Sequence, residues 1–114
     1  MPSYIALTYT DDVDWTEPEH AEVMKEAAAF GEAAAAVIRG GHPLYPTATA
    51  KTVRVVGGKG GKAITSDGPY AETKEVLTGY FLLECADMEE AVRLAAKIPA
   101  AWNGAVEVRP VIEL

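Results

Sequence analysis

The order in which the apolar spacing changes along the chain constrains its fold more than any other feature. Runs with the two-residue period of strands alternate with segments that keep the spacing of helices. The strand-like runs cover residues 3–9, 52–56, 62–66, 79–85 and 106–112, and the helical stripes extend from Met24 to Ile38 and from Met88 to Ile98. The sequence therefore predicts strand, helix, hairpin, strand, helix and strand, within one domain over residues 1–114.

Start and stop signals bound both predicted helices. A capping box needs an acceptor side chain three residues before a Glu, and glycine or proline commonly follows a helix end. The boxes are Thr16 with Glu19 and Asp87 with Glu90, and the stop signals are Gly40-Gly41 and Pro99. Residues 42–50 then read as a connector, and the glycines of 57–61 as a flexible hairpin tip.

This order predicts an α+β fold, a ferredoxin-like antiparallel sheet with two helices on one face. The opposite face would then have no cover, and Tyr80 or Phe81 in the most apolar strand would lie exposed there in a monomer. A second sheet packed face to face would cover this surface. We therefore expect a homodimer.

Charge and cysteine content exclude several classes of protein. With 17 acidic and 10 basic residues the net charge is −7, which argues against nucleic acid and anionic membranes as partners. One cysteine allows no internal disulfide, and no signal peptide or long apolar run is present, so we expect a cytoplasmic protein. Two histidines and one cysteine far apart match no zinc spacing, and we expect neither a metal nor a cofactor.

The polar run that begins at Asp67 interrupts an otherwise apolar stretch and is the first candidate site. Asp67 precedes Gly68-Pro69, so its side chain either caps the turn or serves as a general base or ligand anchor. Tyr70 and Glu72 follow in the same loop and are candidate ligand-binding residues. The structural role of Asp67 is the more common one for this residue type.

Histidine and arginine supply the remaining candidates. His20 lies in the first turns of the first predicted helix, where it is either a partly buried structural residue or an acid–base catalyst. His42 follows the paired glycines and is a candidate ligand contact. Arg109 alternates with valines in the last strand and either pairs with an acid or binds an anionic ligand. Cys85 ends an apolar strand and reads as a buried hydrophobe.

Several segments together resemble the YCII-related family, in the branch with an Asp-Gly-Pro-Phe loop. They are residues 46–50, 53–55, 67–75, 98–101 and 106–111. The resemblance implies a dimeric α/β barrel, similar in fold to muconolactone isomerases and cofactor-free monooxygenases. Some members are linked to extracytoplasmic-function sigma factors. No settled reaction accompanies the family, and a fold alone implies none.

Three positions depart from the pattern of this family. Tyr70 replaces the usual Phe, and His42 stands where an acidic residue is frequent. A His–Asp pair has been suggested for other members, with the Asp before a Pro. His20 lies near the first position, but Ile98 precedes Pro99, so the pair is incomplete here.

Two functions follow as hypotheses. The first is a small-ligand-binding protein or cofactor-independent enzyme, with a pocket between helices and sheet near the Asp67 loop. The alternative is a non-catalytic dimeric interaction module linked to sigma-factor regulation, which the lack of a complete catalytic set favours.

Overall fold

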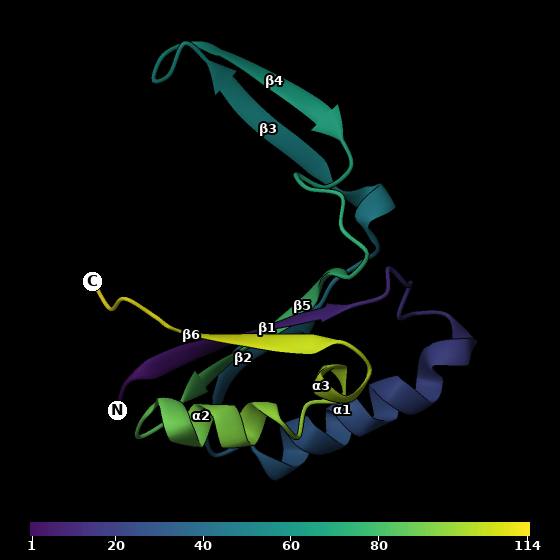
Figure 1. Cartoon of the computed structure of the whole chain (residues 1–114), viewed down its shortest axis with the longest axis vertical. Coiled ribbons are helices and arrows are strands. Elements are labelled where there is room, and N and C mark those ends of the chain that lie inside the picture. Colours follow the sequence, from purple (N-terminus) through teal and green to yellow (C-terminus); the bar gives the residue numbers. More distant parts are fainter.

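A computed structural model describes all residues, 1–114, and shows a mixed α/β fold built on an antiparallel sheet. Its four strands lie in the order β2-β5-β1-β6, and every neighbouring pair is antiparallel. Figure 1 shows the helices on one side of this sheet. The strands are β1 (Ser3–Thr10), β2 (Ile38–Pro43), β5 (Val76–Glu84) and β6 (Ala105–Pro110); the helices are α1 (Ala21–Ala33), α2 (Met88–Ala95) and α3 (Ala100–Asn103), with short 3-10 turns at Pro18–His20 and Thr47–Thr49.

The core forms between the helices and one face of the sheet. Because side chains alternate along a strand, Tyr4 and Ala6 of β1 point to the same face, and both are buried. Leu83 of β5 has no exposed surface, and Phe30 of α1 reaches the same cluster. The rings of Phe30 and Phe81 meet edge to face at 5.2 Å between centroids. Phe81 therefore belongs to the helix side of β5.

The opposite side of the sheet carries a second apolar surface. We call it the open face; it comprises Ile5, Leu7, Tyr9, Tyr80 and Leu82. Cross-strand pairing of Leu7 with Tyr80 and of Ile5 with Leu82 places these side chains together. No α-helix lies on this side (Figure 1). Of the two aromatic residues expected there, only Tyr80 belongs to it.

The first helix is shorter than predicted, and a strand was missed. α1 ends at Ala33, and Ile38, expected in its last turn, begins β2. Gly40 and Gly41 lie inside this strand rather than ending a helix. A Cβ on Gly41 would lie 2.6 Å from the carbonyl oxygen of Tyr80, so glycine permits the close approach of β2 to β5. The misreading arose because glycine is rare in strands and common after helices.

The predicted capping box at Thr16 is also wrong. α1 begins at Ala21, and its N-cap is His20, which makes no capping hydrogen bond through its side chain. Thr16 instead donates to the Asp14 carboxylate, from its backbone N–H at 2.9 Å and its hydroxyl at 2.6 Å. The local Asp–Thr turn forms before the helix, because Asp and Thr readily bond nearby backbone groups.

The start of the second helix and the position of the last strand match their sequence signals. The end of that helix does not, because α2 ends at Ala95 instead of Ile98 and Pro99 is the N-cap of α3, which was not predicted. The Asp87 carboxylate accepts from the Glu90 N–H at 2.9 Å, and the Glu90 carboxylate accepts from the Ala86 N–H at 3.0 Å. The first bond satisfies a donor that the helix itself leaves free, and the second joins the residue before the N-cap to the first turn. Pro110 lies at the end of β6, which is an edge strand, as expected for a residue without an N–H.

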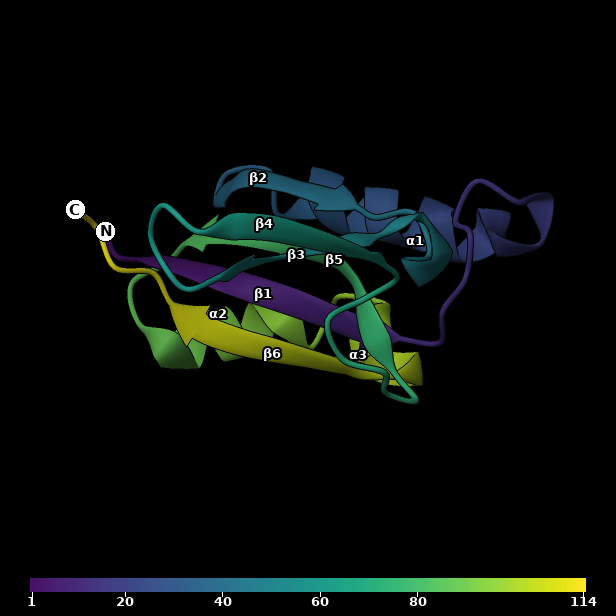
Figure 2. The ribbon, with the colours of Figure 1, turned by 90° about the horizontal axis from the view of Figure 1, so that it is seen from above.

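The predicted hairpin forms, but it stands apart from the main sheet. β3 (Lys51–Val56) and β4 (Lys62–Asp67) pair only with each other, and we call residues 51–67 the arm. The arm rises from the sheet side that bears no α-helix and extends over the sheet (Figures 1 and 2). The radius of gyration is 16.0 Å, against about 13 Å for a compact chain of this length. The arm accounts for this excess.

None of the helices combines the length and apolarity that crossing a bilayer requires.

Candidate functional site

A cavity of about 500 Å³ opens between α1, the sheet and the segment that leads into α3. Its volume is within the range of small-molecule sites. The walls are mostly apolar, since α1 contributes its inner face and β5 contributes Phe81. The polar groups that line it are Thr8, Thr10, Asp11, His20, His42, Thr78 and Asn103.

Three threonines form a polar cluster on the sheet side of the cavity. Thr8 and Thr10 are successive inward residues of β1, and Thr78 faces them from β5; each is 6% exposed. The Thr10 hydroxyl lies 3.2 Å from that of Thr78, which lies 3.3 Å from that of Thr8. Hydroxyl groups rotate and both donate and accept, so this cluster can adapt to a ligand oxygen or nitrogen.

His20 lies at the entrance to the cavity. Its position as the N-cap of α1 fixes the backbone, and its side chain is 21% exposed. Its nearest charged neighbour is Glu19, with 3.7 Å between Nε2 and Oε1, which is too long for a hydrogen bond. Trp15 also lines the cavity and contacts the imidazole. The imidazole thus lies between the Trp15 ring and the cavity, and its nitrogens remain free for a ligand.

The loop before α1 holds Trp15 in place. Asp14 accepts both hydrogen bonds from Thr16, and these bonds hold the pKa of the Asp14 carboxyl below its ordinary value. A further backbone bond joins the Glu17 N–H to the Asp14 carbonyl at 3.1 Å. Hydrogen bonds from Thr16 and Glu17 to Asp14 therefore close the turn that carries Trp15.

Carboxylates gather beside the entrance. A hydrogen bond with Glu19 raises the pKa of the Glu17 carboxyl above its ordinary value. Glu17, Glu19 and His20 offer ligand-type atoms within 4.8 Å of one another, an arrangement that could meet a cation. Both acids are exposed, and exposed carboxylate pairs are common on protein surfaces.

The cavity lining contains neither lysine nor arginine. Carboxylate and phosphate groups are bound mainly through such cations, so the site lacks the usual means to hold an anion. Apolar walls with a few hydroxyl and imidazole groups suit an uncharged molecule that carries one or two polar atoms.

The structure brings only two of the predicted site residues to this cavity. His20 and His42 line it, although the His42 imidazole meets the ring of its cross-strand partner Tyr80, which belongs to the open face. Asp67, expected beside a helix–sheet pocket, is the last residue of β4 in the arm. The Asp67 side chain is 83% exposed and forms an ion pair with Lys51. The only hydrogen bond of its carboxylate goes to Lys51, so the turn that follows is not capped by this side chain.

The other candidates lie elsewhere on the surface. Tyr70 is 76% exposed, and the Arg54 guanidinium sits 5.1 Å from its ring centroid. Glu72 is exposed in the loop before β5. Arg109 lies on β6 opposite Ile5, on the side of the open face, and forms no ion pair.

Sequence reasoning missed the threonine cluster and Trp15. A signal for the threonines existed, since Thr8 and Thr10 continue the alternation of Tyr4 and Ala6 and so predict polar groups on a buried face. The position of Trp15 had no such signal, because it lies in an irregular loop. Cys85 is buried as predicted; burial raises the pKa of its thiol, and Glu90 and Asp87 act in the same direction.

Comparisons with known proteins place these features in a family. The YCII-related domain matches residues 3–114. An uncharacterized protein of Rhizobium meliloti is 35% identical over 114 residues, which cover 94% of this chain and 90% of that protein. A solved structure of 5-chloro-2-hydroxyhydroquinone dehydrochlorinase from Burkholderia phenoliruptrix, in complex with 2,5-dihydroxybenzoquinone, is 15% identical and has a TM-score of 0.48, with 94% of this chain and 90% of that chain covered.

Proposed function

Since this chain belongs to the YCII-related family, we propose that it binds a small uncharged molecule in the α1 cavity and acts on it as an enzyme through His20. The observation that carries the proposal is the meeting of His20 and three threonine hydroxyls in one apolar cavity. The lack of lysine and arginine in the lining argues against an anionic ligand, and the mostly apolar walls favour an uncharged one.

In this proposal His20 performs the proton transfer. A neutral imidazole accepts a proton from the ligand, holds it as imidazolium and returns it to another atom of the same molecule. The threonine hydroxyls orient the ligand by hydrogen bonds, and the apolar walls exclude water. Such a step is balanced without a cofactor, and it classes the reaction as an isomerisation or a proton-assisted elimination.

A thermal-shift screen with uncharged metabolites tests the binding. A compound that binds only the folded chain raises its melting temperature, by an amount that grows with the ratio of ligand concentration to Kd. Ala27→Phe places a large side chain in the cavity and should abolish the shift. Ala29→Phe is the matched control on an exposed position of α1 outside the lining, and should keep it. Equal shifts in both variants would contradict a ligand in this cavity.

We also propose that two chains pair through their open faces as a ferredoxin-like dimeric barrel of the Asp-Gly-Pro-Phe branch. The strand order β2-β5-β1-β6 and the uncovered side chains of Leu7 and Leu82 support this arrangement. Asp67, Tyr70, Glu72 and Arg109 lie outside the cavity of one chain, so a role in ligand binding requires the second chain. Sedimentation should give about twice the chain mass of 12.1 kDa.

A non-catalytic interaction module is the second candidate. The exposed arm favours it, because four large apolar side chains there meet no other part of the chain: Val53, Val55, Val56 and Ile64. A chain whose only role is interaction would tolerate His20→Gln and Ala27→Phe together without loss of partner binding. Loss of a measured turnover in these variants supports the enzyme instead.

A further inference from the structure

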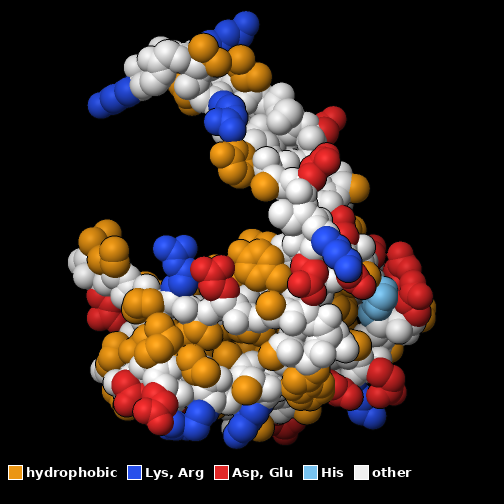
Figure 3. Space-filling view, in the orientation of Figure 1, with side chains coloured by type: hydrophobic (Ala, Val, Ile, Leu, Met, Phe, Trp, Pro, Cys, Tyr) orange, Lys and Arg blue, Asp and Glu red, His pale blue; other side chains and the backbone are white.

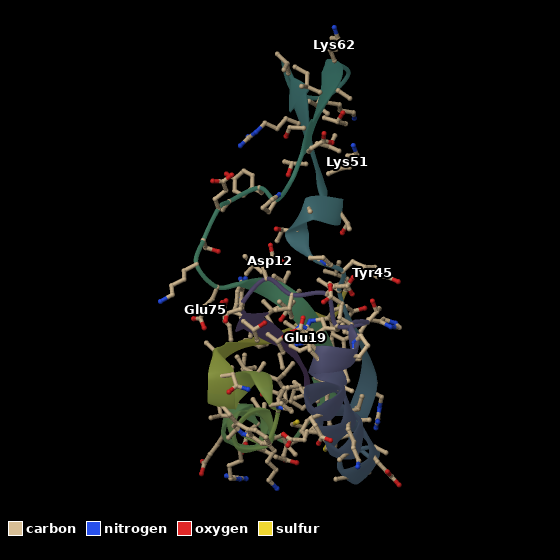
Figure 4. All side chains as sticks on the ribbon, turned by 90° about the vertical axis from the view of Figure 1, so that its right-hand side faces the viewer. Asp12, Glu19, Tyr45, Lys51, Lys62 and Glu75 are labelled. Atoms are coloured by element: carbon tan, nitrogen blue, oxygen red, sulfur yellow. The ribbon has the colours of Figure 1, made fainter.

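The arm and the remainder of the chain carry opposite charges. Residues 51–67 contain four basic side chains and one acidic side chain, a net charge of +3. All other residues, which we call the body, contain six basic and sixteen acidic side chains, a net charge of −10. Figure 4 shows Lys51 and Lys62 on the arm, and Asp12, Glu19 and Glu75 on the body. The overall charge of −7 conceals this separation.

The arm also exposes apolar surface that its own chain leaves uncovered. Val53 is 61% exposed and Val56 is 57% exposed, and no residue of β4 is buried. A two-stranded hairpin alone in water is marginally stable, so packing against another surface is expected to contribute to its order. Figure 3 shows the arm separated from the body, with basic and apolar side chains along it. The arm therefore has the composition of a contact surface.

We propose that the arm is an electrostatic clasp that binds the acidic body of a second copy of this chain. This inference rests on the dimer proposed above and adds the surface that secures it. The arm projects from the side that bears the open face, so a partner seated on that face lies within its reach (Figure 1). In a two-fold dimer each chain contributes one basic arm and one acidic body, so both contacts form together.

Charge decides between this partner and a polyanion such as nucleic acid. A phosphate backbone would meet the arm but would be repelled by a body of charge −10. The body of a second copy offers carboxylates instead and allows the apolar residues of the arm to be covered at the same time. The chain thus contains both halves of a complementary pair.

Salt should change the dimer Kd in opposite directions with and without the clasp. Two chains of charge −7 repel each other on the whole, so screening alone would strengthen their association. An arm held to a body by opposite charges predicts the reverse, a dimer Kd that rises when salt is raised from about 30 mM to about 500 mM. Sedimentation equilibrium measures the dimer Kd at both salt concentrations. A Kd that stays constant or falls with salt would overturn the clasp.

Charge reversal on the arm sharpens the test. Lys59→Glu with Lys62→Glu changes the arm from +3 to −1 and should raise the dimer Kd at low salt by about tenfold or more. Lys25→Glu with Lys97→Glu makes the same change in net charge on exposed positions of the helix side and is the matched control. If both double variants dimerise equally, the clasp is wrong while the open-face dimer stands. A monomeric parent chain would overturn both proposals.

Zero-length cross-linking locates the contact. A carbodiimide joins a lysine amine to a carboxylate only where the two groups touch. In a mixture of isotopically light and heavy chains, we expect mixed-mass peptides that link Lys59 or Lys62 to a body carboxylate. Links found only within one chain would show that the arm binds its own body, and would overturn the proposal.

Discussion

The rings of Trp15 and His20 meet edge to face, with 5.5 Å between their centroids, where both residues line the α1 cavity. An indole at this position reports on whatever enters the cavity, because its emission depends on the polarity around it. The other tryptophan, Trp102, is 59% exposed and lies outside the lining.

The first prediction uses this difference. In Trp102→Phe, whose only lost side-chain bond is the one from Nε1 to the Ala96 carbonyl, all tryptophan emission comes from Trp15. We expect a saturable shift of that emission when a thermal-shift ligand is added. The reciprocal variant, Trp15→Phe, should give no shift with the same ligand. A response that persists there would place the ligand outside the cavity.

His20→Gln should separate chemistry from folding. The glutamine retains polar atoms but cannot take up a proton, so turnover of an identified substrate should fall about 10²- to 10⁴-fold. The melting temperature should hardly change, because the imidazole makes no capping bond and is 21% exposed. Glu22→Gln, at an exposed position of α1 outside the cavity lining, is the control. Full turnover in His20→Gln would remove this residue from the site.

Neighbouring leucines of β5 should respond in opposite ways to the same change. Leu83 is fully buried in the core, so Leu83→Asp should unfold the chain, because an unpaired buried charge is strongly destabilising. Leu82 belongs to the open face, and Leu82→Asp should leave a folded monomer. Circular dichroism and sedimentation measure the two outcomes. A folded, dimeric Leu82→Asp would contradict pairing through the open face.

Replacing two glycines by alanine should change the free energy of unfolding in opposite directions. Gly41→Ala should lower the free energy of unfolding by about 1–3 kcal/mol, because its Cβ would meet backbone atoms of Tyr80 and Phe81. Gly31 lies inside α1, and a Cβ there meets nothing within 4 Å. Gly31→Ala should therefore raise that free energy by about 0.5–1 kcal/mol through helix propensity. Urea titrations of both variants give the comparison.

Cys85 should make stability depend on alkaline pH. Its folded pKa is raised, so above the ordinary thiol pKa the unfolded chain loses a proton that the folded chain keeps. The free energy of unfolding then falls as pH rises through that range, by at most about 1.4 kcal/mol per pH unit. Cys85→Ala should remove this slope. A thiol reagent that reacts with the native chain as fast as with the unfolded chain would contradict the burial.

Local sequence signals predicted the helices and strands themselves better than they predicted which elements pack or pair with one another. The Asp87 box identified α2 because the whole signal lies within four residues. The strand at Gly40-Gly41 was missed because its glycines are required by a neighbour, Tyr80, that is distant in sequence. The hairpin at 51–67 was recognised from its own pattern, yet nothing in that pattern indicates that its strands do not pair with the main sheet.

The candidate site shows the same limit. His20 was expected in the first turns of the first helix, and it lies just before them as the N-cap of α1, where it lines the cavity. Asp67 was assigned to the pocket by its chemistry alone, and its location depends on where the arm points. Thr78 joins Thr8 through strand pairing across about seventy residues, which a single sequence does not reveal.

The base of the arm has an evolutionary consequence. The Gly68 N–H donates to the Ala50 carbonyl at 2.9 Å, so the chain leaves the body and returns to it at one point. An insertion, deletion or replacement between these residues need not disturb the sheet, the helices or the cavity. With the proposed clasp, duplicated copies of such a gene can therefore diverge in which copy they recognise while the chemistry of the cavity is inherited unchanged.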